Sequence, residues 1–128
     1  MINNDQIKEI QSRIDDLHKY LQIDKKKIEI ANDDEKTAAP EFWDNPKEAE
    51  AFLKVLRSKK KWVEAYEEIH TQFEDLQVLM DFAKEDPDSE KELDETFPQL
   101  VEKIDKEVSH IIFNIVKSNH FHIGIVNG

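Results

Sequence analysis

The sequence predicts an all-α protein, an elongated, antiparallel bundle of three coiled-coil-like helices with a short extra helix near residues 89–95. Apolar residues recur at alternating intervals of three and four through three long stretches, which places them on one face of a helix. Glycine and proline are rare, with 2 and 4 residues among 128, and 37% of the residues are charged. This composition favours long helices over a β-sandwich. Short connections between long helices favour antiparallel neighbours.

The first helix is expected to begin after Asn3, Asn4 and Asp5, because these residue types cap helix N-termini well. Its apolar stripe consists of Ile7, Ile10, Ile14, Leu17, Leu21 and Ile28. Asp24 interrupts that stripe, so we expect the helix to loosen there or to leave its partner, and to end near Asn32.

Residues 33–45 are expected to connect the first two helices, since Pro40 favours an extended residue before it. Phe42 and Trp43 are large apolar residues within this connection. Two interpretations apply to them. They seal the end of the core, which we favour, or they form an exposed binding anchor.

The second helix is expected to run from Pro46 to about Lys84, a length of about 60 Å at a rise of 1.5 Å per residue. Asn45 as a cap, Pro46 at the first helical position and Glu48 soon after form a strong start signal. A helix of this length must pack along most of its surface to be stable.

Two further start signals follow Pro87. Residues 89–92 form a capping box for the short extra helix, and residues 96–99 form another for the last long helix. We expect Pro98 in the first turn of that last helix, where proline is tolerated, and not as a break within a helix. The apolar stripe of the last helix consists of Phe97, Val101, Ile104, Val108, Ile111 and Ile115.

The last residues differ in character from the rest, because they are nearly uncharged and alternate only weakly. We therefore expect a helical domain at residues 1–117 and a divergent or flexible C-terminal tail at residues 118–128. A short strand and a peptide unrelated to the domain are the alternatives for this tail. On a strand His120 and His122 would face one way, but no third ligand is indicated, so no metal site is expected.

Composition excludes several classes of function. The net charge of −11, from 18 basic and 29 acidic residues, opposes independent nucleic-acid binding. The absence of cysteine excludes disulfides and thiol chemistry. No glycine-rich phosphate loop or nucleophile motif occurs, so we expect no enzymatic activity, no cofactor and no metal. No signal peptide or apolar run of about 18 residues is present, so no membrane association is expected.

One basic cluster lies in the middle of the expected second helix. It consists of Arg57, Lys59, Lys60 and Lys61, and Trp62 follows it. One interpretation is a small contact patch for ribosomal RNA or for an acidic protein. The other, which we favour from the residues alone, is a solvated helix face on which Trp62 is partly packed.

The start of the second helix also carries a family resemblance. Residues 42–46 read Phe-Trp-Asp-Asn-Pro, and a basic, aromatic middle and an acidic, apolar end follow up to residue 85. This pattern resembles the N-terminal helical domain of bacterial peptide chain release factor 2. Residues 7–27 are similar to the opening helix of that family, and the last helix, to about Phe113, is similar to the helix that leads into its next domain. The resemblance covers roughly residues 1–115.

The resemblance implies a cytoplasmic, ribosome-contacting domain that acts in translation termination at certain stop codons. Full-length members of that family use a Ser-Pro-Phe tripeptide to read the codon and a Gly-Gly-Gln loop to promote hydrolysis of peptidyl-tRNA. Neither motif occurs here, so no catalytic residue carries over. The contact with the ribosome is expected on the exposed face of the second helix, at Arg57, Lys60 and Lys61.

The alternative function is that of a free-standing helical interaction or adaptor protein without release activity. Protein partners and weak self-association through exposed bundle surface fit both functions. Beyond about residue 115 the sequence departs from the family. A natural truncation, a changed reading frame or a deliberately shortened fragment would each give this departure.

Overall fold

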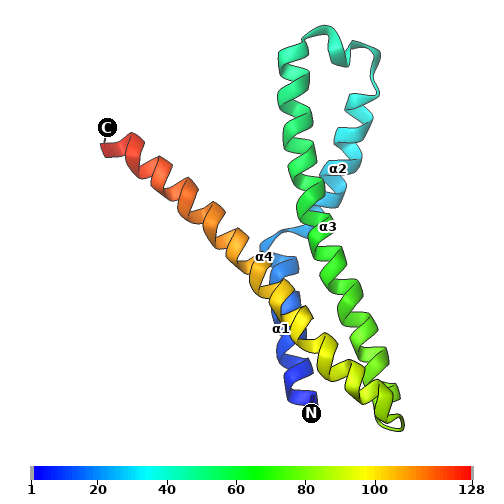
Figure 1. The fold of residues 1–128 in the computed structure, drawn as a ribbon. Helices are drawn as coiled ribbons and strands as arrows, with labels where there is room; N and C mark the ends of the chain where they lie inside the picture. Colours follow the sequence, from blue (N-terminus) through cyan, green and yellow to red (C-terminus); the bar gives the residue numbers. More distant parts are fainter. Residues whose placement is uncertain (1, 128) are drawn as a thin grey trace. The chain divides into compact units, whose positions relative to one another are not determined.

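The computed structural model of the protein describes residues 2–127, and the side chains of residues 2–117. These residues form four α-helices and one 3-10 helix, and no strand, so the predicted all-α class is confirmed (Figure 1). The chain divides into two compact units. Unit 1 consists of Met1–Arg13 and Gln72–Gly128, and unit 2 of Ile14–Thr71. The elongated three-helix arrangement stays a prediction.

Helix α1 (Asn4–Tyr20) begins two residues before the predicted start, so that of Asn3, Asn4 and Asp5 only Asn3 precedes the helix. The Asn3 side-chain oxygen accepts a hydrogen bond from the backbone N–H of Gln6 at 2.9 Å, and the Gln6 side-chain oxygen accepts one from the backbone N–H of Asn3 at 2.9 Å. This reciprocal pair satisfies two backbone donors that the first turn of a helix leaves free.

The sequence predicts one helix up to about Asn32 that loosens at Asp24. The structure instead has two helices, because α2 (Ile23–Thr37) follows α1 after a break. The single helix is therefore wrong, but the break lies only two residues before the expected loosening at Asp24. Gln22 lies in the break with φ 51° and ψ 53°, a left-handed conformation that cannot continue a right-handed helix. The break shifts the helical phase of the apolar stripe. Ile28 is consequently 64% exposed, whereas Ile23 is fully buried.

A 3-10 helix, η1 (Pro40–Asp44), joins α2 to α3 (Pro46–Ala83). Helix α2 therefore continues five residues into the predicted connection, residues 33–45. The predicted start of α3 is confirmed, since the Asn45 side-chain oxygen accepts the backbone N–H of Glu48 at 3.3 Å. Its end at Ala83 lies one residue from the prediction.

The last helix, α4 (Pro87–Asn127), is continuous, so the predicted separate helix near residues 89–95 is wrong. Asp86 caps α4, because its carboxylate accepts from the backbone N–H of Asp88 at 3.2 Å and from the Ser89 hydroxyl at 2.8 Å. Pro87 occupies the first helical position, where its fixed φ fits.

Pro98 lies inside α4 and not in its first turn. Proline lacks the N–H that would bond the carbonyl four residues back, and here that carbonyl belongs to the exposed residue Asp94, so water can satisfy it. The buried side chains continue on one face across the proline. They are Leu93, Phe97, Leu100, Ile104 and Ile111.

In unit 1 the end of α3 and the first half of α4 form a helical hairpin, and the first half of α1 lies beside them (Figure 1). The Arg13 guanidinium on α1 pairs with the Asp105 carboxylate on α4 at 2.5 Å. Besides the α4 stripe, this unit buries Ile7, Ile10, Phe73 and Leu76.

In unit 2 helix α2 lies antiparallel beside the first part of α3, with η1 at the tip of the hairpin (Figure 1). The Lys27 ammonium on α2 pairs with the Glu67 carboxylate on α3 at 2.5 Å. The buried apolar residues of this unit are Ile14, Leu17, Leu21, Ile23, Ala49, Leu56, Tyr66 and Ile69.

The C-terminal tail continues the backbone of α4 up to Asn127, so the alternative of a short strand is wrong. The side chains of residues 118–128 lie outside the described residues, and with them the histidine arrangement expected at His120 and His122. The division at residue 117 stays a prediction. None of the helices in the described part of the chain combines the length and the apolar character that a bilayer crossing requires.

Candidate functional site

The basic cluster of α3 belongs to unit 2 and is split by helical geometry. Successive residues of an α-helix point about 100° apart, so four neighbouring cations cannot share one face. Lys59 and Lys60 lie against α2, whereas Arg57 and Lys61 are exposed. The sequence therefore predicted a single patch where the structure has two surfaces.

Lys59 binds carboxylates of α2. Its ammonium nitrogen lies 2.9 Å from the Asp33 Oδ2 and 3.2 Å from the Glu29 Oε2. Asp33 is the one buried charged residue in the described part of the chain, with 8% of its surface exposed. The hydrogen bonds that Lys59 donates to the Asp33 and Glu29 carboxylates raise the pKa of Lys59. Its charge is thus engaged within the fold and is not offered to a partner.

Lys60 is also paired, because its ammonium nitrogen lies 3.0 Å from the Asp34 Oδ1. Both side chains are about half exposed, and exposed pairs of this kind contribute only about 0–1 kcal/mol. A partner that offers a stronger anion can therefore exchange with Asp34 at low cost, although Lys60 is not a free cation in this structure.

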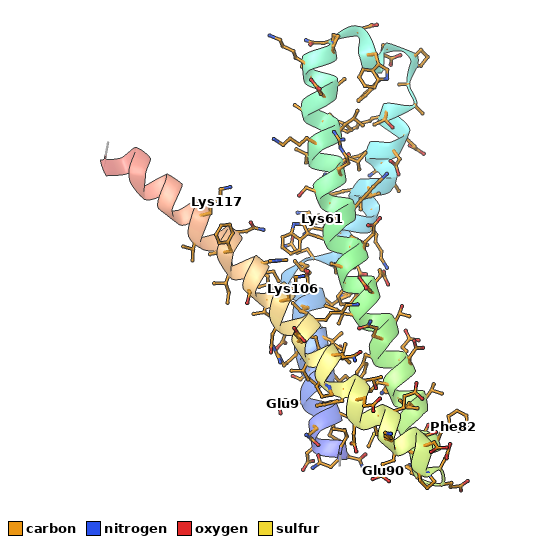
Figure 2. The ribbon with its side chains drawn as sticks, in the orientation of Figure 1. Glu9, Lys61, Phe82, Glu90, Lys106 and Lys117 are labelled. Atoms are coloured by element: carbon orange, nitrogen blue, oxygen red, sulfur yellow. The ribbon has the colours of Figure 1, made fainter. Side chains whose placement is uncertain are left out.

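Arg57 and Lys61 form the exposed part of the cluster, one turn apart on the same face of α3. The Arg57 Nε donates to the backbone carbonyl of Leu53 at 3.3 Å, and the residue as a whole is exposed. Lys61, labelled in Figure 2, makes no ion pair with any other described residue. Lys54 extends this face by one turn. The basic cluster predicted from the sequence did not include Lys54, although the spacings of three residues to Arg57 and four more to Lys61 place all three on one face. Trp62 is half-buried, as expected.

Phe42 and Trp43, at the tip of unit 2, differ in how far they are buried, so the two interpretations, sealing the core and an exposed anchor, are taken separately for each. The Phe42 ring packs edge-on against Trp43 at 5.2 Å and against Phe52 of α3 at 5.7 Å, measured between ring centroids. Phe42 is half-buried by these contacts, in the direction of the packing that we favoured for it. Trp43 is 57% exposed, so sealing is wrong for this residue.

A second group of titratable side chains surrounds Tyr66 in unit 2. The His18 ring lies edge-on to Tyr66 at 5.3 Å, and the His18 Nε2 is 3.3 Å from the Asp24 carboxylate. Burial raises the pKa of Tyr66, and the negative charges of Glu67, Asp15 and Asp24 raise it further. The ring contacts pack α1 and α3 together within this unit. His18 is partly buried.

No group of three or more histidine, aspartate or glutamate side chains that could hold a metal ion occurs among the described residues.

Comparison with known proteins gives these helices a family. The family model of the PCRF domain matches residues 25–120, which include nearly all of α2, all of η1 and α3, and most of α4. The chain belongs to the PCRF domain family. Within its PCRF domain lie the exposed Arg57 and Lys61, the paired Lys60 and the aromatic tip.

Curated relatives of this PCRF domain protein carry the name peptide chain release factor 2. The relative from Exiguobacterium sp. is 29% identical over 80% of this chain and 28% of its own length. The relative from Streptomyces avermitilis is 28% identical over the same shares of the two chains. The relative from Proteus mirabilis is 28% identical over 90% of this chain and 31% of its own length. The chain therefore spans about three tenths of the length of these relatives. No solved structure matches it.

Proposed function

We propose that this chain acts in translation termination as the N-terminal, ribosome-contacting domain of a stop-codon-specific peptide chain release factor. The observation that carries the proposal is the PCRF match over residues 25–120, together with relatives named peptide chain release factor 2 that align with 80–90% of the chain. In this proposal the domain works in the cytoplasm by binding the ribosome and positioning the rest of the factor.

The proposed contact consists of Arg57, Lys60 and Lys61 on α3. Two properties support it. Arg57 and Lys61 present their charges on one exposed face, and Lys60 holds Asp34 through a pair that is weak enough to exchange. Ribosomal RNA offers a dense array of phosphates that such cations bind through release of counterions.

The proposal assigns no catalysis to this chain. Its sequence contains no Gly-Gly pair and no Ser-Pro pair, so it has neither of the tripeptides through which the release factor family is expected to act. Binding is then the whole of its contribution.

The test measures binding of the 128-residue chain to intact bacterial ribosomes that hold a stop codon in the A site. We expect the chain to co-sediment with these ribosomes and to release no peptide on its own. The double variant Arg57→Glu/Lys61→Glu should bind about tenfold more weakly, because each reversal replaces a phosphate contact by a repulsion. Lys60→Glu should have a smaller effect, since Lys60 already shares its charge with Asp34.

The matched control is Lys8→Glu/Lys106→Glu, which reverses two exposed lysines on α1 and α4 of unit 1 (Lys106 is labelled in Figure 2). It changes the net charge equally and should alter binding by less than about twofold if the α3 face is specific. Equal losses in both double variants would contradict the assignment of the contact. An absence of co-sedimentation at unchanged helix content would overturn the proposal and favour the free-standing adaptor.

A further inference from the structure

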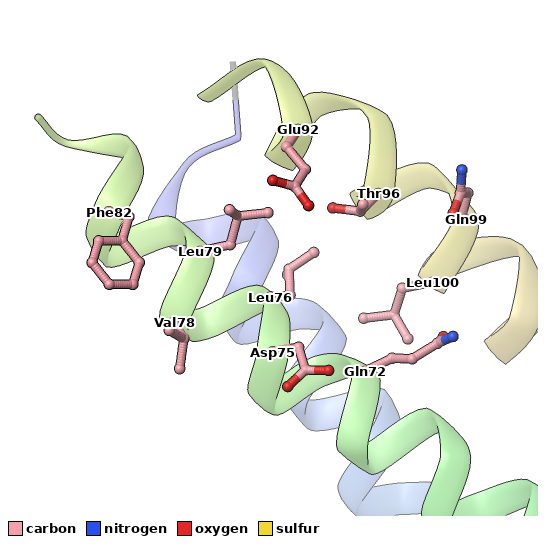
Figure 3. Close-up of a pocket in the computed structure, with 10 residues that line it drawn as sticks. All are labelled: Gln72, Asp75, Leu76, Val78, Leu79, Phe82, Glu92, Thr96, Gln99 and Leu100. Carbon is pink, nitrogen blue, oxygen red and sulfur yellow. The ribbon is translucent and has the colours of Figure 1, made fainter. Parts of the chain in front are cut away.

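A groove runs along unit 1 between the end of α3 and the start of α4. Its volume is about 440 Å³. Leu76 and Leu100 form its floor and are almost fully buried, and Leu79 stands beside them. Figure 3 shows these three leucines between the two helices, with Glu92 and Thr96 directed into the same space from α4.

The α3 rim of this groove is exposed, with an acidic residue followed by two apolar ones. Asp75, Val78 and Phe82 follow one another at intervals of three and four, so they lie on one stripe along the helix. Val78 is 57% exposed and Phe82 is 62% exposed. A phenylalanine so exposed beside a leucine-lined groove leaves an apolar surface that a further helix, beyond α1, α3 and α4, would cover.

The charge around the groove is strongly negative. Residues 74–95 contain ten carboxylates and two lysines, a net charge of −8, whereas the whole chain carries −11. The 22 residues of this α3–α4 hairpin therefore hold most of the excess negative charge of the protein. Two of these carboxylates, Asp75 and Glu92, line the groove itself, one on each helix.

From the groove and its charge we infer a docking site for a basic amphipathic helix of a partner protein. An apolar stripe on that helix packs onto Leu76, Leu79 and Phe82, and flanking lysines or arginines pair with Asp75 and Glu92. Charge complementarity decides the occupant. The net charge of −8 on residues 74–95 would repel both an acidic segment and a nucleic acid. The inference stands apart from the proposed ribosome contact, because it uses other residues of another unit.

The test uses a synthetic, fluorescein-labelled helical peptide with leucines at intervals of three and four and lysines elsewhere. Its binding to the full 128-residue chain is followed by fluorescence anisotropy. We expect saturable binding that weakens as the salt concentration rises, because the rim charges are exposed and screened. A peptide with glutamate in place of lysine, and one with the leucine positions shuffled, should each bind at least about tenfold more weakly.

Variants then locate the site. Val78→Ser/Phe82→Ser should weaken binding of the lysine peptide by about tenfold or more, as loss of an interface anchor does. Both side chains are exposed, so the fold should persist, and circular dichroism checks this. The matched control is Val55→Ser, also on α3 and 56% exposed but outside the groove; it should leave binding unchanged.

The charge variants separate the groove from its acidic surroundings. Asp75→Asn/Glu92→Gln should weaken binding more than Asp88→Asn/Asp94→Asn, which removes the same charge from the same hairpin without touching the groove. Equal binding of the lysine and glutamate peptides, or no loss in Val78→Ser/Phe82→Ser, would overturn the inference. Sedimentation could also detect a dimer that forms through Phe82 and that the peptide does not dissociate. That result would overturn the inference, because the occupant of the groove would then be a second copy of this chain.

Discussion

The left-handed residue between α1 and α2 allows a direct test of the fold. Gln22 is the one non-glycine residue with positive φ among the described residues, at φ 51°. A side chain with a Cβ costs about 1–2 kcal/mol in this conformation. Glycine avoids that cost but loses about 0.4–1 kcal/mol more on folding, because its unfolded chain is freer. Gln22→Gly should therefore raise the free energy of unfolding by about 0.5–1 kcal/mol.

Two matched variants fix the sign of this effect. Gln11→Gly makes the same replacement at an exposed position in the middle of α1, where glycine should lower the free energy of unfolding by about 1 kcal/mol. Gln22→Val places a β-branched residue at positive φ and should lower it by about 1 kcal/mol or more.

Urea unfolding followed by circular dichroism gives the three values, with the slope against urea concentration checked for constancy. The reasoning fails if Gln22→Gly is as destabilising as Gln11→Gly, since α1 and α2 would then form one continuous helix in solution.

Two further predictions concern the cores. Ile104→Ala should lower the free energy of unfolding by about 2–5 kcal/mol, because Ile104 is fully buried in unit 1. Ile112 lies on the same helix but is exposed, so Ile112→Ala should change the free energy of unfolding by less than about 0.5 kcal/mol. Similar midpoints of the two variants in urea would contradict the burial of Ile104. Tyr66 has a pKa raised above 10.0 in the folded state, so its contribution to stability is complete below pH 10 and is lost as the pH rises through the folded pKa. Tyrosinate absorbance should show that late titration, and Tyr66→Phe should remove this component of the pH dependence; an unchanged alkaline profile in Tyr66→Phe would contradict it.

Helix starts were predictable from sequence because the groups that cap them are local. Asn3 and Asn45 each accept the N–H of the residue three positions later, as their residue types and neighbours indicate. The end of α3 followed equally well from the proline just beyond it. Such signals need no knowledge of tertiary contacts, so they survive whatever packing the chain adopts.

The errors arose where tertiary packing outweighed a local signal. Pro98 is a strong local breaker, but the buried face from Leu93 through Phe97 to Ile104 continues across it and keeps α4 whole. Gln22 carries no turn signal in its residue type. The interrupted apolar stripe indicated a loosening at Asp24, but not the left-handed residue two positions earlier.

The basic cluster of α3 was evident in the sequence, but which of its side chains are free to contact a partner was only partly predictable. Four adjacent basic residues suggested one patch, but the pairing of Lys59 and Lys60 with α2 depends on where that helix packs. A sequence can show that Arg57 and Lys61 share a face, because their spacing fixes it. The sequence cannot show that α2 packs against the face of α3 that carries Lys59 and Lys60. The groove of unit 1 was missed for the same reason, since it needs two helices side by side.

The discontinuous make-up of unit 1 has a consequence for folding during synthesis. Unit 2 is one uninterrupted stretch, so its contacts can form as soon as residue 71 has left the exit tunnel. Ile7 and Ile10 emerge first, yet the other buried residues of their unit lie between Phe73 and Ile111. At about 5–20 residues per second, these isoleucines wait on the order of 3–20 s in the nascent chain. Within unit 1, the segment that is synthesised first is thus among the last to pack.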